Sequence, residues 1–282
     1  MDGFKTAAFA DEAADGLDGQ INALRRNGIG LLELRNADGV NVARLGYRKA
    51  LNAASKLRKA GIGVWSIGSP IGKIGIYDDF GPHAESFRRC LDMADIFGAK
   101  HIRIFSFYVD PAEKQRDREG VFGRVAERLS EFVDMSRGRG IVLCHENEKG
   151  IFGERPADCL LIHREFPEIR AVFDPANYLQ VGEATLPAFE MLRPYVEYMH
   201  IKDLDVKSGE VVPPGCGDGF IPELIGLFGG GTLTLEPHLK VFKGLAELER
   251  KGGRSAVGNA YASRRAAFDA AAKALKKCVE SK

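Results

Sequence analysis

Short apolar segments alternate with longer amphipathic segments along almost the whole chain. The short segments are typical of buried β-strands, and several are rich in Val, Ile or Phe. The longer segments have the spacing of helices with one apolar face. The predicted strands are 6–9, 30–34, 63–67, 101–105, 141–146, 170–174, 196–201 and 232–236. The predicted helices are 17–27, 42–59, 82–97, 118–137, 157–165, 186–192, 221–227 and 260–277.

Four of these helices are followed by a glycine and then by a strand. The glycines are Gly28, Gly61, Gly98 and Gly140, and glycine is the residue that most often ends a helix. Strands that alternate with helices pair in parallel, because each helix is the crossover between neighbouring strands. Eight such units in this length predict an α/β fold of the (β/α)8 TIM barrel type. We expect one barrel domain over residues 1–282, with a partly helical excursion on the rim at 239–259.

Length, charge and cysteine usage narrow the function classes. The 282 residues suit one large domain, and a net charge of +1 offers no general nucleic-acid or membrane-surface footprint. No apolar stretch is long enough to span a bilayer, and acidic residues stand where a signal peptide needs a basic and then apolar stretch. The five cysteines form no CxxC pair, which favours a reduced, cytoplasmic protein. Neither a GxGxxG nor a GxxxxGK[ST] loop is present, which argues against nucleotide-binding folds.

Polar residues end four consecutive predicted strands: Glu146, Asp174, His200 and Glu236. Side chains alternate between the interior and the helix layer along a barrel strand. Leu233 and Leu235 suit the helix layer, so the next residue, Glu236, points to the interior of the barrel. The same alternation directs Glu146, Asp174 and His200 inward. Active sites of barrel enzymes lie at the carboxyl ends of the strands. Each residue alone has a structural explanation, such as a rim salt bridge or a turn cap, but the set of four is harder to explain that way.

Three buried carboxylates and one imidazole that converge would repel one another without a cation. Three oxygen ligands and one nitrogen ligand suit a single Mn²⁺, Mg²⁺, Co²⁺ or Zn²⁺ ion, and the lack of thiolates argues against a structural zinc site. The sequence therefore predicts one divalent metal ion bound by Glu146, Asp174, His200 and Glu236.

The chain resembles the xylose isomerase-like barrel superfamily of sugar phosphate isomerases and epimerases over nearly its whole length. The resemblance rests on the segments LCHENE (143–148), FDPAN (173–177), HIKD (200–203), GCGDG (215–219) and LEP (235–237). In that family, the residues that match Glu146, Asp174, His200 and Glu236 bind one divalent metal. One position departs from the family pattern, because many of its epimerases have histidine where this chain has Asn177, and asparagine cannot act as a general base.

The resemblance implies an isomerase or epimerase that acts on a small sugar or keto-polyol through an enediolate. A bound metal lowers the pKa of the C–H group next to the substrate carbonyl, and Glu146 and Glu236 are the candidate acid and base. The same ligands would also serve a dehydratase of the inosose dehydratase type. The apurinic endonuclease branch is disfavoured by only six histidines and a net charge near zero. A non-catalytic binding barrel is disfavoured by the intact set of four ligands.

Four further residues are candidate substrate contacts: Asn177, Lys202, Arg103 and Glu148. For Lys202, a substrate contact and a salt bridge to a neighbouring carboxylate remain open. Arg103 is unusual inside a strand, so we expect it to bridge interior carboxylates or to bind a substrate oxygen. Glu148 lies on a loop and faces either substrate or solvent.

Charged residues also end the second predicted strand, and a histidine directly precedes Glu146. Glu33 and Arg35 end the second predicted strand, where an ion pair between two rim residues is favoured over a role in the pocket. His145 is out of phase with Glu146 and is expected to lie behind the strand. The partly apolar segment 241–248 suggests contact with a second copy of the chain, which would make a homo-oligomer.

Overall fold

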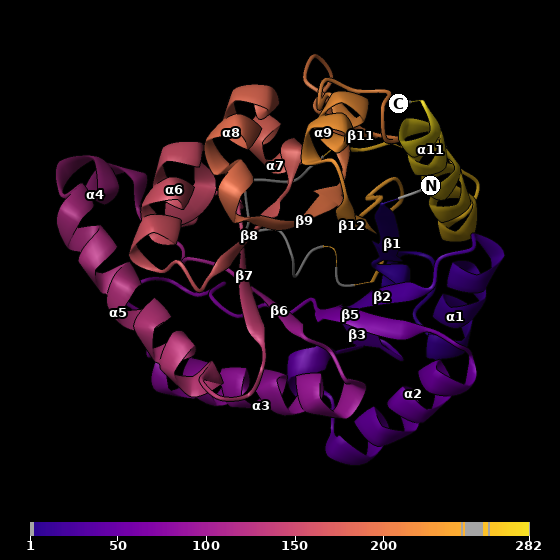
Figure 1. Cartoon of the computed structure of the whole chain (residues 1–282), viewed down its shortest axis with the longest axis horizontal. Coiled ribbons are helices and arrows are strands. Elements are labelled where there is room, and N and C mark those ends of the chain that lie inside the picture. Colours follow the sequence, from indigo (N-terminus) through magenta and orange to yellow (C-terminus); the bar gives the residue numbers. More distant parts are fainter. Residues whose placement is uncertain (1–2, 244, 246–255, 259, 282) are drawn as a thin grey trace.

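The computed structural model describes residues 3–243, 245, 256–258 and 260–281. Eight parallel strands form a closed barrel in the order β1-β12-β9-β8-β7-β6-β5-β2. The fold is therefore the predicted (β/α)8 TIM barrel, with strands inside and helices around them (Figure 1). The barrel strands are β1 (Phe4–Ala8), β2 (Leu31–Leu34), β5 (Gly63–Ile67), β6 (His101–Ile104), β7 (Val142–Glu146), β8 (Arg170–Phe173), β9 (Val196–Ile201) and β12 (Gly231–Leu235).

The helices lie between successive strands, as the alternating pattern predicts. They are α1 (Leu17–Arg26), α2 (Tyr47–Lys59), α3 (Gly81–Phe97), α4 (Pro111–Arg116), α5 (Arg118–Ser136), α6 (Pro156–Glu165), α7 (Pro175–Gln180), α8 (Thr185–Leu192), α9 (Ile221–Phe228) and α11 (Arg264–Glu280). Short 3-10 turns are η1 (Ala10–Glu12), η2 (Val42–Arg44), η3 (Phe152–Glu154) and η4 (Arg193–Tyr195). Gly98, which ends α3, has a φ of 69°, a left-handed conformation that glycine adopts without strain.

The predicted helix over 42–59 is broken near its start. Val42–Arg44 forms the 3-10 turn η2, whose first residues are held because Ala43 N donates to Asn41 Oδ1. Leu45 and Gly46 are then extended, and α2 begins only at Tyr47. This bend buries Leu45. The apolar pattern alone does not distinguish such a bend from a continuous helix.

The alternation of side chains divides the core into two layers. Cys144, Val172 and Tyr198 form a small cluster inside the barrel, where Trp65 also packs. Met199 and Leu233 belong to the much larger cluster between the strands and the helices. The predicted inward and outward faces of β7, β8, β9 and β12 are thus confirmed, and the inward faces lead toward the carboxyl ends of these strands.

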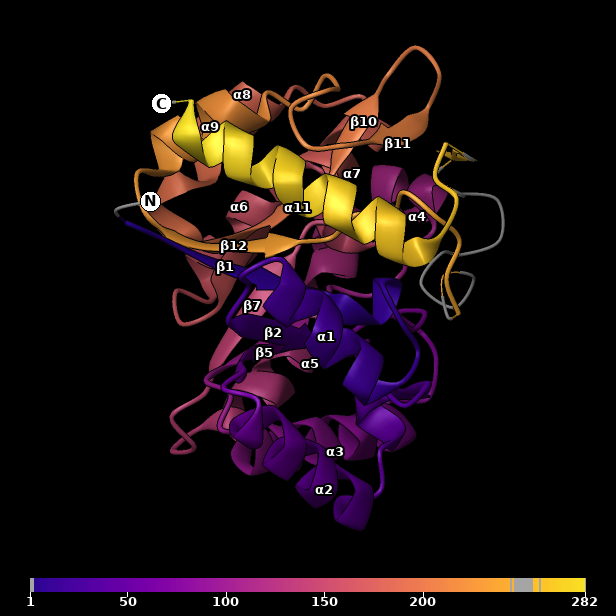
Figure 2. The ribbon, with the colours of Figure 1, turned by 90° about the vertical axis from the view of Figure 1, so that its right-hand side faces the viewer.

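Helix α11 lies beside α1 and α9 and so joins the last unit of the barrel to the first (Figure 2). It begins at Arg264, later than predicted, because the Ser263 hydroxyl accepts from Ala266 N and caps the helix there. Within the described residues, none of the helices is both long and apolar enough for a bilayer crossing.

The rim excursion predicted at 239–259 falls largely outside the described residues. Within this range, the strand β13 (Ala256–Val257) pairs with β11 (Glu210–Val212). Strand β11 also pairs with β10 (Asp203–Asp205). A separate two-stranded hairpin joins β3 (Asn36–Ala37) and β4 (Val40–Asn41). Half of the segment 241–248, predicted to contact a second copy, lies outside the described residues, and that prediction remains untested.

Candidate metal centre

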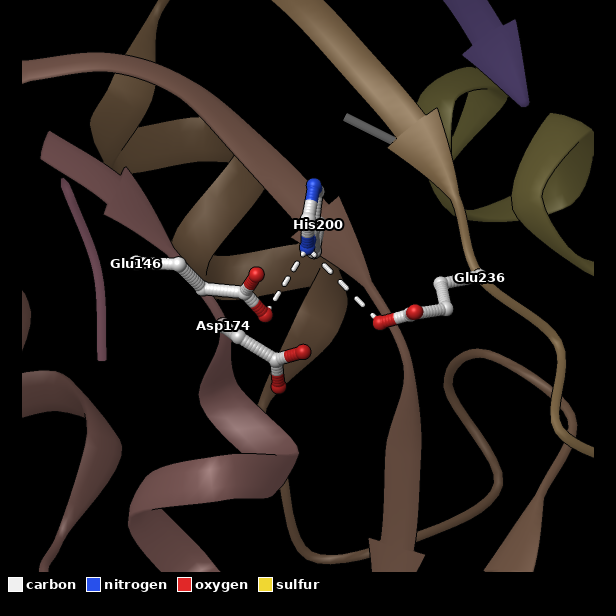
Figure 3. Close-up of side chains that lie close together, drawn as sticks. All are labelled: Glu146, Asp174, His200 and Glu236. Carbon is white, nitrogen blue, oxygen red and sulfur yellow. Dashed lines mark hydrogen bonds and ion pairs between the residues drawn. The ribbon is translucent and has the colours of Figure 1, made fainter. Parts of the chain in front are cut away.

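Glu146, Asp174, His200 and Glu236 meet at the carboxyl end of the barrel. Glu146 is the last residue of β7, Asp174 and Glu236 directly follow β8 and β12, and His200 is in β9. All four are at most 3 % exposed. One ligand atom from each lies within 4.8 Å of the others, so these atoms are close enough to surround one ion. Figure 3 shows the three carboxylates and the imidazole directed toward a common centre.

The orientation of His200 is set by carboxylates on both sides of its ring. Nε2 lies 3.2 Å from Glu33 Oε2, and Nδ1 lies 3.1 Å from Glu146 Oε1 and 3.7 Å from Glu236 Oε2. Glu33 is itself held, because the Tyr198 hydroxyl donates to its other oxygen. A carboxylate behind a ligating imidazole commonly fixes its tautomer and raises its basicity. The Nε2 contact to Glu33 therefore leaves Nδ1 directed toward the other three candidate ligands.

The electrostatics of the cluster favour positive charge at its centre. Burial alone would lower the pKa of His200, but Glu146 and Glu33 raise it to about 10. Burial raises the pKa of Asp174, which reaches about 6 although Lys202 opposes the shift. Several buried carboxylates around one imidazole are the donor set and the charge that a divalent cation needs.

Lys202 makes salt bridges with two of the four candidate ligands. Its Nζ lies 2.8 Å from Asp174 Oδ2 and 3.2 Å from Glu236 Oε2, and only 5 % of the residue is exposed. The salt bridge to a neighbouring carboxylate, left open by the sequence, is therefore present. Asp203, the next residue along the chain, instead accepts hydrogen bonds from the backbone of the 215–219 loop.

Arg103 and Asn177 both hold Glu146. Arg103 Nη1 lies 3.1 Å from Glu146 Oε2, while its Nη2 donates to the carbonyls of Gly68 and Ser69. Asn177 Nδ2 donates to Glu146 Oε1 over 3.3 Å, and its backbone N donates to Asp174 Oδ1. Burial raises the pKa of Glu146, but His200 and Arg103 outweigh it and lower that pKa to about 2. Arg103 thus contacts one interior carboxylate and two backbone carbonyls, and its contact with a substrate oxygen stays a prediction.

Glu148 lies in the loop after β7 and pairs with Lys73 Nζ at 2.7 Å. Lys73 also lies 4.4 Å from the centre of the Phe105 ring. This ion pair joins the loops after β5 and β7 beside the barrel mouth. His145 lies behind its strand, as predicted, where its Nε2 contacts the Ser106 hydroxyl.

The predicted ion pair between Glu33 and Arg35 on the rim is wrong. Both residues are buried, and Glu33 faces Tyr198 and His200 across the barrel. Arg35 forms hydrogen bonds with Asp11, Glu12 and Glu236 instead. The register shift between Leu32 and Glu33 in the pairing of β2 with β5 is an irregularity that strand alternation does not anticipate.

Two buried residues near Glu236 were not identified from the sequence. Glu12 lies in η1 after β1, and His238 lies two residues beyond Glu236. His238 Nε2 is 3.4 Å from Glu12 Oε1 and 3.5 Å from Glu236 Oε1. Both residues stand in turns, where the two-residue alternation of a strand no longer tells which way a side chain points. Their position just past the ends of β1 and β12 was the one available signal.

Comparison with solved structures shows the same fold in proteins of low sequence identity. The probable 3-DHS dehydratase AsbF from Bacillus anthracis matches with a TM-score of 0.72 and 15% identity, over 96% of this chain and 98% of that one. An L-ribulose 3-epimerase matches with a TM-score of 0.72 and 16% identity, over 100% of this chain and 95% of that one. The IOLI protein, solved with a zinc atom, matches with a TM-score of 0.71 and 14% identity, over 98% of each chain.

No curated protein matches the sequence significantly. The family profile described as xylose isomerase-like TIM barrel matches residues 21–236, which is well over half of the chain and contains all four candidate ligands. The matched segment and the closed eight-stranded barrel agree, and the chain belongs to the xylose isomerase-like TIM barrel family.

Proposed function

We propose that the protein is a divalent-metal-dependent isomerase or epimerase that acts on a small sugar or keto-polyol through an enediolate. The observation that carries this proposal is the buried cluster of Glu146, Asp174, His200 and Glu236, with one ligand atom of each within 4.8 Å of the others. Mn²⁺, Mg²⁺, Co²⁺ and Zn²⁺ all suit three carboxylates and one imidazole. The epimerase and the zinc-bound protein among the similar structures support the proposal.

The four side chains would hold the cation, with His200 contributing Nδ1 because Nε2 faces Glu33. When bound, the cation would polarise the carbonyl group of a substrate and so acidify the neighbouring C–H bond. The family match and the donor set both support this assignment.

Glu146 and Glu236 are the proposed acid and base, and they come from strands separated by β8 and β9 around the barrel. Arg103 and Asn177 fix the carboxylate of Glu146, and Arg35 and Lys202 fix that of Glu236. A carboxylate held in this way takes or returns a proton with little reorganisation, and such acid–base catalysis contributes about 10²- to 10⁴-fold in rate.

The remaining candidate residues are proposed to bind the substrate at the barrel mouth. Lys202 Nζ, at 2.8 Å from Asp174 Oδ2, is a buried donor beside the cluster and suits a substrate oxygen. Asn177 donates from Nδ2 to Glu146 Oε1 and to the Asn147 carbonyl, so its Oδ1 would accept from a substrate hydroxyl or a water molecule, but it cannot remove a proton. Glu148 would reach the substrate from the loop after β7, where it pairs with Lys73 of the loop after β5. Arg103 contacts Glu146 and two carbonyls, so we assign it chiefly to positioning Glu146.

A dehydratase is the second candidate function. Removal of the same proton followed by loss of hydroxide, rather than return of the proton, would make the enzyme a lyase of the inosose dehydratase type. The similarity to a probable 3-DHS dehydratase favours keeping this candidate.

The test is a screen of ketoses, inososes and hydroxypyruvate in deuterium oxide with the Mn²⁺-loaded protein. An isomerase or epimerase incorporates deuterium at a carbon next to the carbonyl without loss of water, whereas a dehydratase releases water from the same substrate. The Glu236→Gln variant is expected to keep its fold and to lose deuterium uptake by at least about 100-fold. Full uptake by Glu236→Gln would remove Glu236 from the mechanism.

A further inference from the structure

The two oxygens of Glu236 face different groups of side chains. Oε2 faces the candidate metal centre, at 3.2 Å from Lys202 Nζ and 3.7 Å from His200 Nδ1. Oε1 faces away from that centre, at 2.9 Å from Arg35 Nη1 and 3.5 Å from His238 Nε2. A carboxylate whose two oxygens point into two adjacent ligand clusters has the orientation of a bridging ligand.

The group around Oε1 contains a second set of metal-ligating side chains. Glu12, Glu236 and His238 each offer one ligand atom within 4.8 Å of the others, and all three residues are at most 5 % exposed. The strands that precede them, β1 and β12, are neighbours in the barrel, so the turns after these strands meet. The backbone N of His238 donates to Glu12 Oε2, which directs Oε1 toward the imidazole.

His238 is the observation that points to a ligand. Its two ring nitrogens are buried, and among the described residues neither has a hydrogen-bond partner, although Nε2 lies 3.4 Å from Glu12 Oε1 and 3.5 Å from Glu236 Oε1. Buried polar atoms in proteins are nearly always satisfied, so an imidazole that faces two carboxylates without a hydrogen bond needs another partner. Ligand atoms at bond lengths of about 2.1 Å around a tetrahedral ion stand about 3.4 Å apart, which matches the distances from His238 Nε2 to the two carboxylate oxygens.

Arg35 lies beside this group, and its charge must be compatible with a cation there. Asp11 accepts from both Nε and Nη2 of Arg35, and this two-point contact gives the guanidinium a carboxylate partner outside the group of Glu12, Glu236 and His238. The single contacts to Glu12 Oε1 and Glu236 Oε1 leave each oxygen a second lone pair. Carboxylates that ligate a metal commonly accept such hydrogen bonds as well.

We propose that Glu12, Glu236 and His238 form a second divalent-cation site, joined to the first by the bridging carboxylate of Glu236. The second site rests on the proposed function, because Glu236 belongs to both sites. Two sites bridged by one carboxylate would place two cations about 3.5–4 Å apart. The protein would then bind two Mn²⁺ ions per chain, and their unpaired spins would be coupled.

The test uses the full chain, freed of metal by a chelator and titrated with Mn²⁺. Bound Mn²⁺ is counted by elemental analysis after equilibrium dialysis, and spin coupling is measured by electron paramagnetic resonance. Wild-type protein is expected to bind two ions per chain and to give a coupled two-ion spectrum. His238→Leu is expected to bind one ion, with the uncoupled six-line spectrum of single Mn²⁺. Glu12→Gln is expected to weaken the second binding step by at least tenfold and to leave the first unchanged.

His163→Leu is the matched control, because His163 is a buried histidine in α6 that contacts neither cluster. It is expected to bind two coupled ions, as wild type does. Circular dichroism establishes that each variant is folded before titration. One uncoupled ion per chain in wild type would overturn the second site and leave the first intact. Binding of no ion by folded wild type would overturn both the second site and the proposed function.

Discussion

Three buried basic side chains, Arg35, Arg103 and Lys202, each contact at least one of the candidate ligands. Removing one partner of such a pair would leave a buried charge without compensation, which typically costs about 3–5 kcal/mol. These contacts hold the carboxylates in place while the ring of His200 is held by Glu33. At the residue scale, the site is therefore a network in which each acidic group has a fixed orientation.

Glu33 contacts the proposed metal site through His200. We expect Glu33→Gln to weaken Mn²⁺ binding by about 10- to 100-fold, because the uncharged amide no longer orients the imidazole or raises its basicity. Isothermal titration calorimetry measures the affinity.

Glu197→Gln is the control, because Glu197 also contacts a histidine, His101 Nε2 at 3.1 Å, in a pair that includes none of the candidate ligands. That variant should bind Mn²⁺ as wild type does. Equal affinities for Glu33→Gln and wild type would contradict the role given to Glu33.

His163 makes stability depend on pH. Burial lowers its pKa from 6.5 to about 4, and its Nδ1 is 3.0 Å from the carbonyl of Ile169. Because the unfolded chain binds this proton more readily, the contribution of His163 is complete above pH 6.5 and is lost as the pH falls toward 4. We expect the loss between pH 7 and pH 5 to be about 2 kcal/mol.

The variant His163→Gln, which cannot take up that proton, should show a shallower fall in the free energy of unfolding over the same range. Urea unfolding at several pH values measures it. Parallel curves for the variant and wild type would show that His163 does not contribute.

At the element scale, the strands and their faces follow from the sequence. Glu146 at the end of β7, and Asp174 and Glu236 directly after β8 and β12, could be assigned to the interior because inward and outward positions alternate up to these residues. Alternation gives the face of a side chain but not its partner across the barrel. For that reason the partners of Glu33 and Arg35 were predicted wrongly, and Glu12 and His238, in turns, were not predicted at all.

The 215–219 loop shows how a short motif supports the site from outside. Asp203 accepts hydrogen bonds from the backbone N of Leu204, Gly215, Gly217 and Gly219 at 2.9–3.0 Å. This carboxylate follows Lys202 in sequence, so the loop is tied to the end of β9. Gly217 and Gly219 are needed because an added Cβ at either position would lie 2.6 Å from Asp203 Oδ1.

Gly217→Ala should destabilise the protein by about 1–3 kcal/mol, because the added Cβ would lie 2.5 Å from the Leu204 carbonyl oxygen and 2.6 Å from Asp203 Oδ1. Urea denaturation measures the change. Gly226→Ala is the control, since a Cβ there in α9 meets nothing within 4 Å and alanine favours the helix by up to about 1 kcal/mol. Equal stability of Gly217→Ala and wild type would argue against the tight loop.

At the scale of the whole molecule, closure of the barrel brings the candidate ligands together from distant parts of the sequence. Glu146 and Glu236 are ninety positions apart in the chain, yet β7 and β12 direct them to the same end of the barrel. Helix α11 contacts α1 and α9, and β1 pairs with β12, so the first and last units are joined. The fold thereby brings the residues of the proposed acid–base chemistry to the carboxyl end of the barrel.

The central claim is that Glu146, Asp174, His200 and Glu236 bind one divalent cation among them. Anomalous diffraction from crystals grown with Mn²⁺ tests it most directly. The account predicts a manganese peak about 2.0–2.3 Å from His200 Nδ1 and from one oxygen of each of the three carboxylates. A crystal saturated with Mn²⁺ that shows no peak among these four side chains would contradict it.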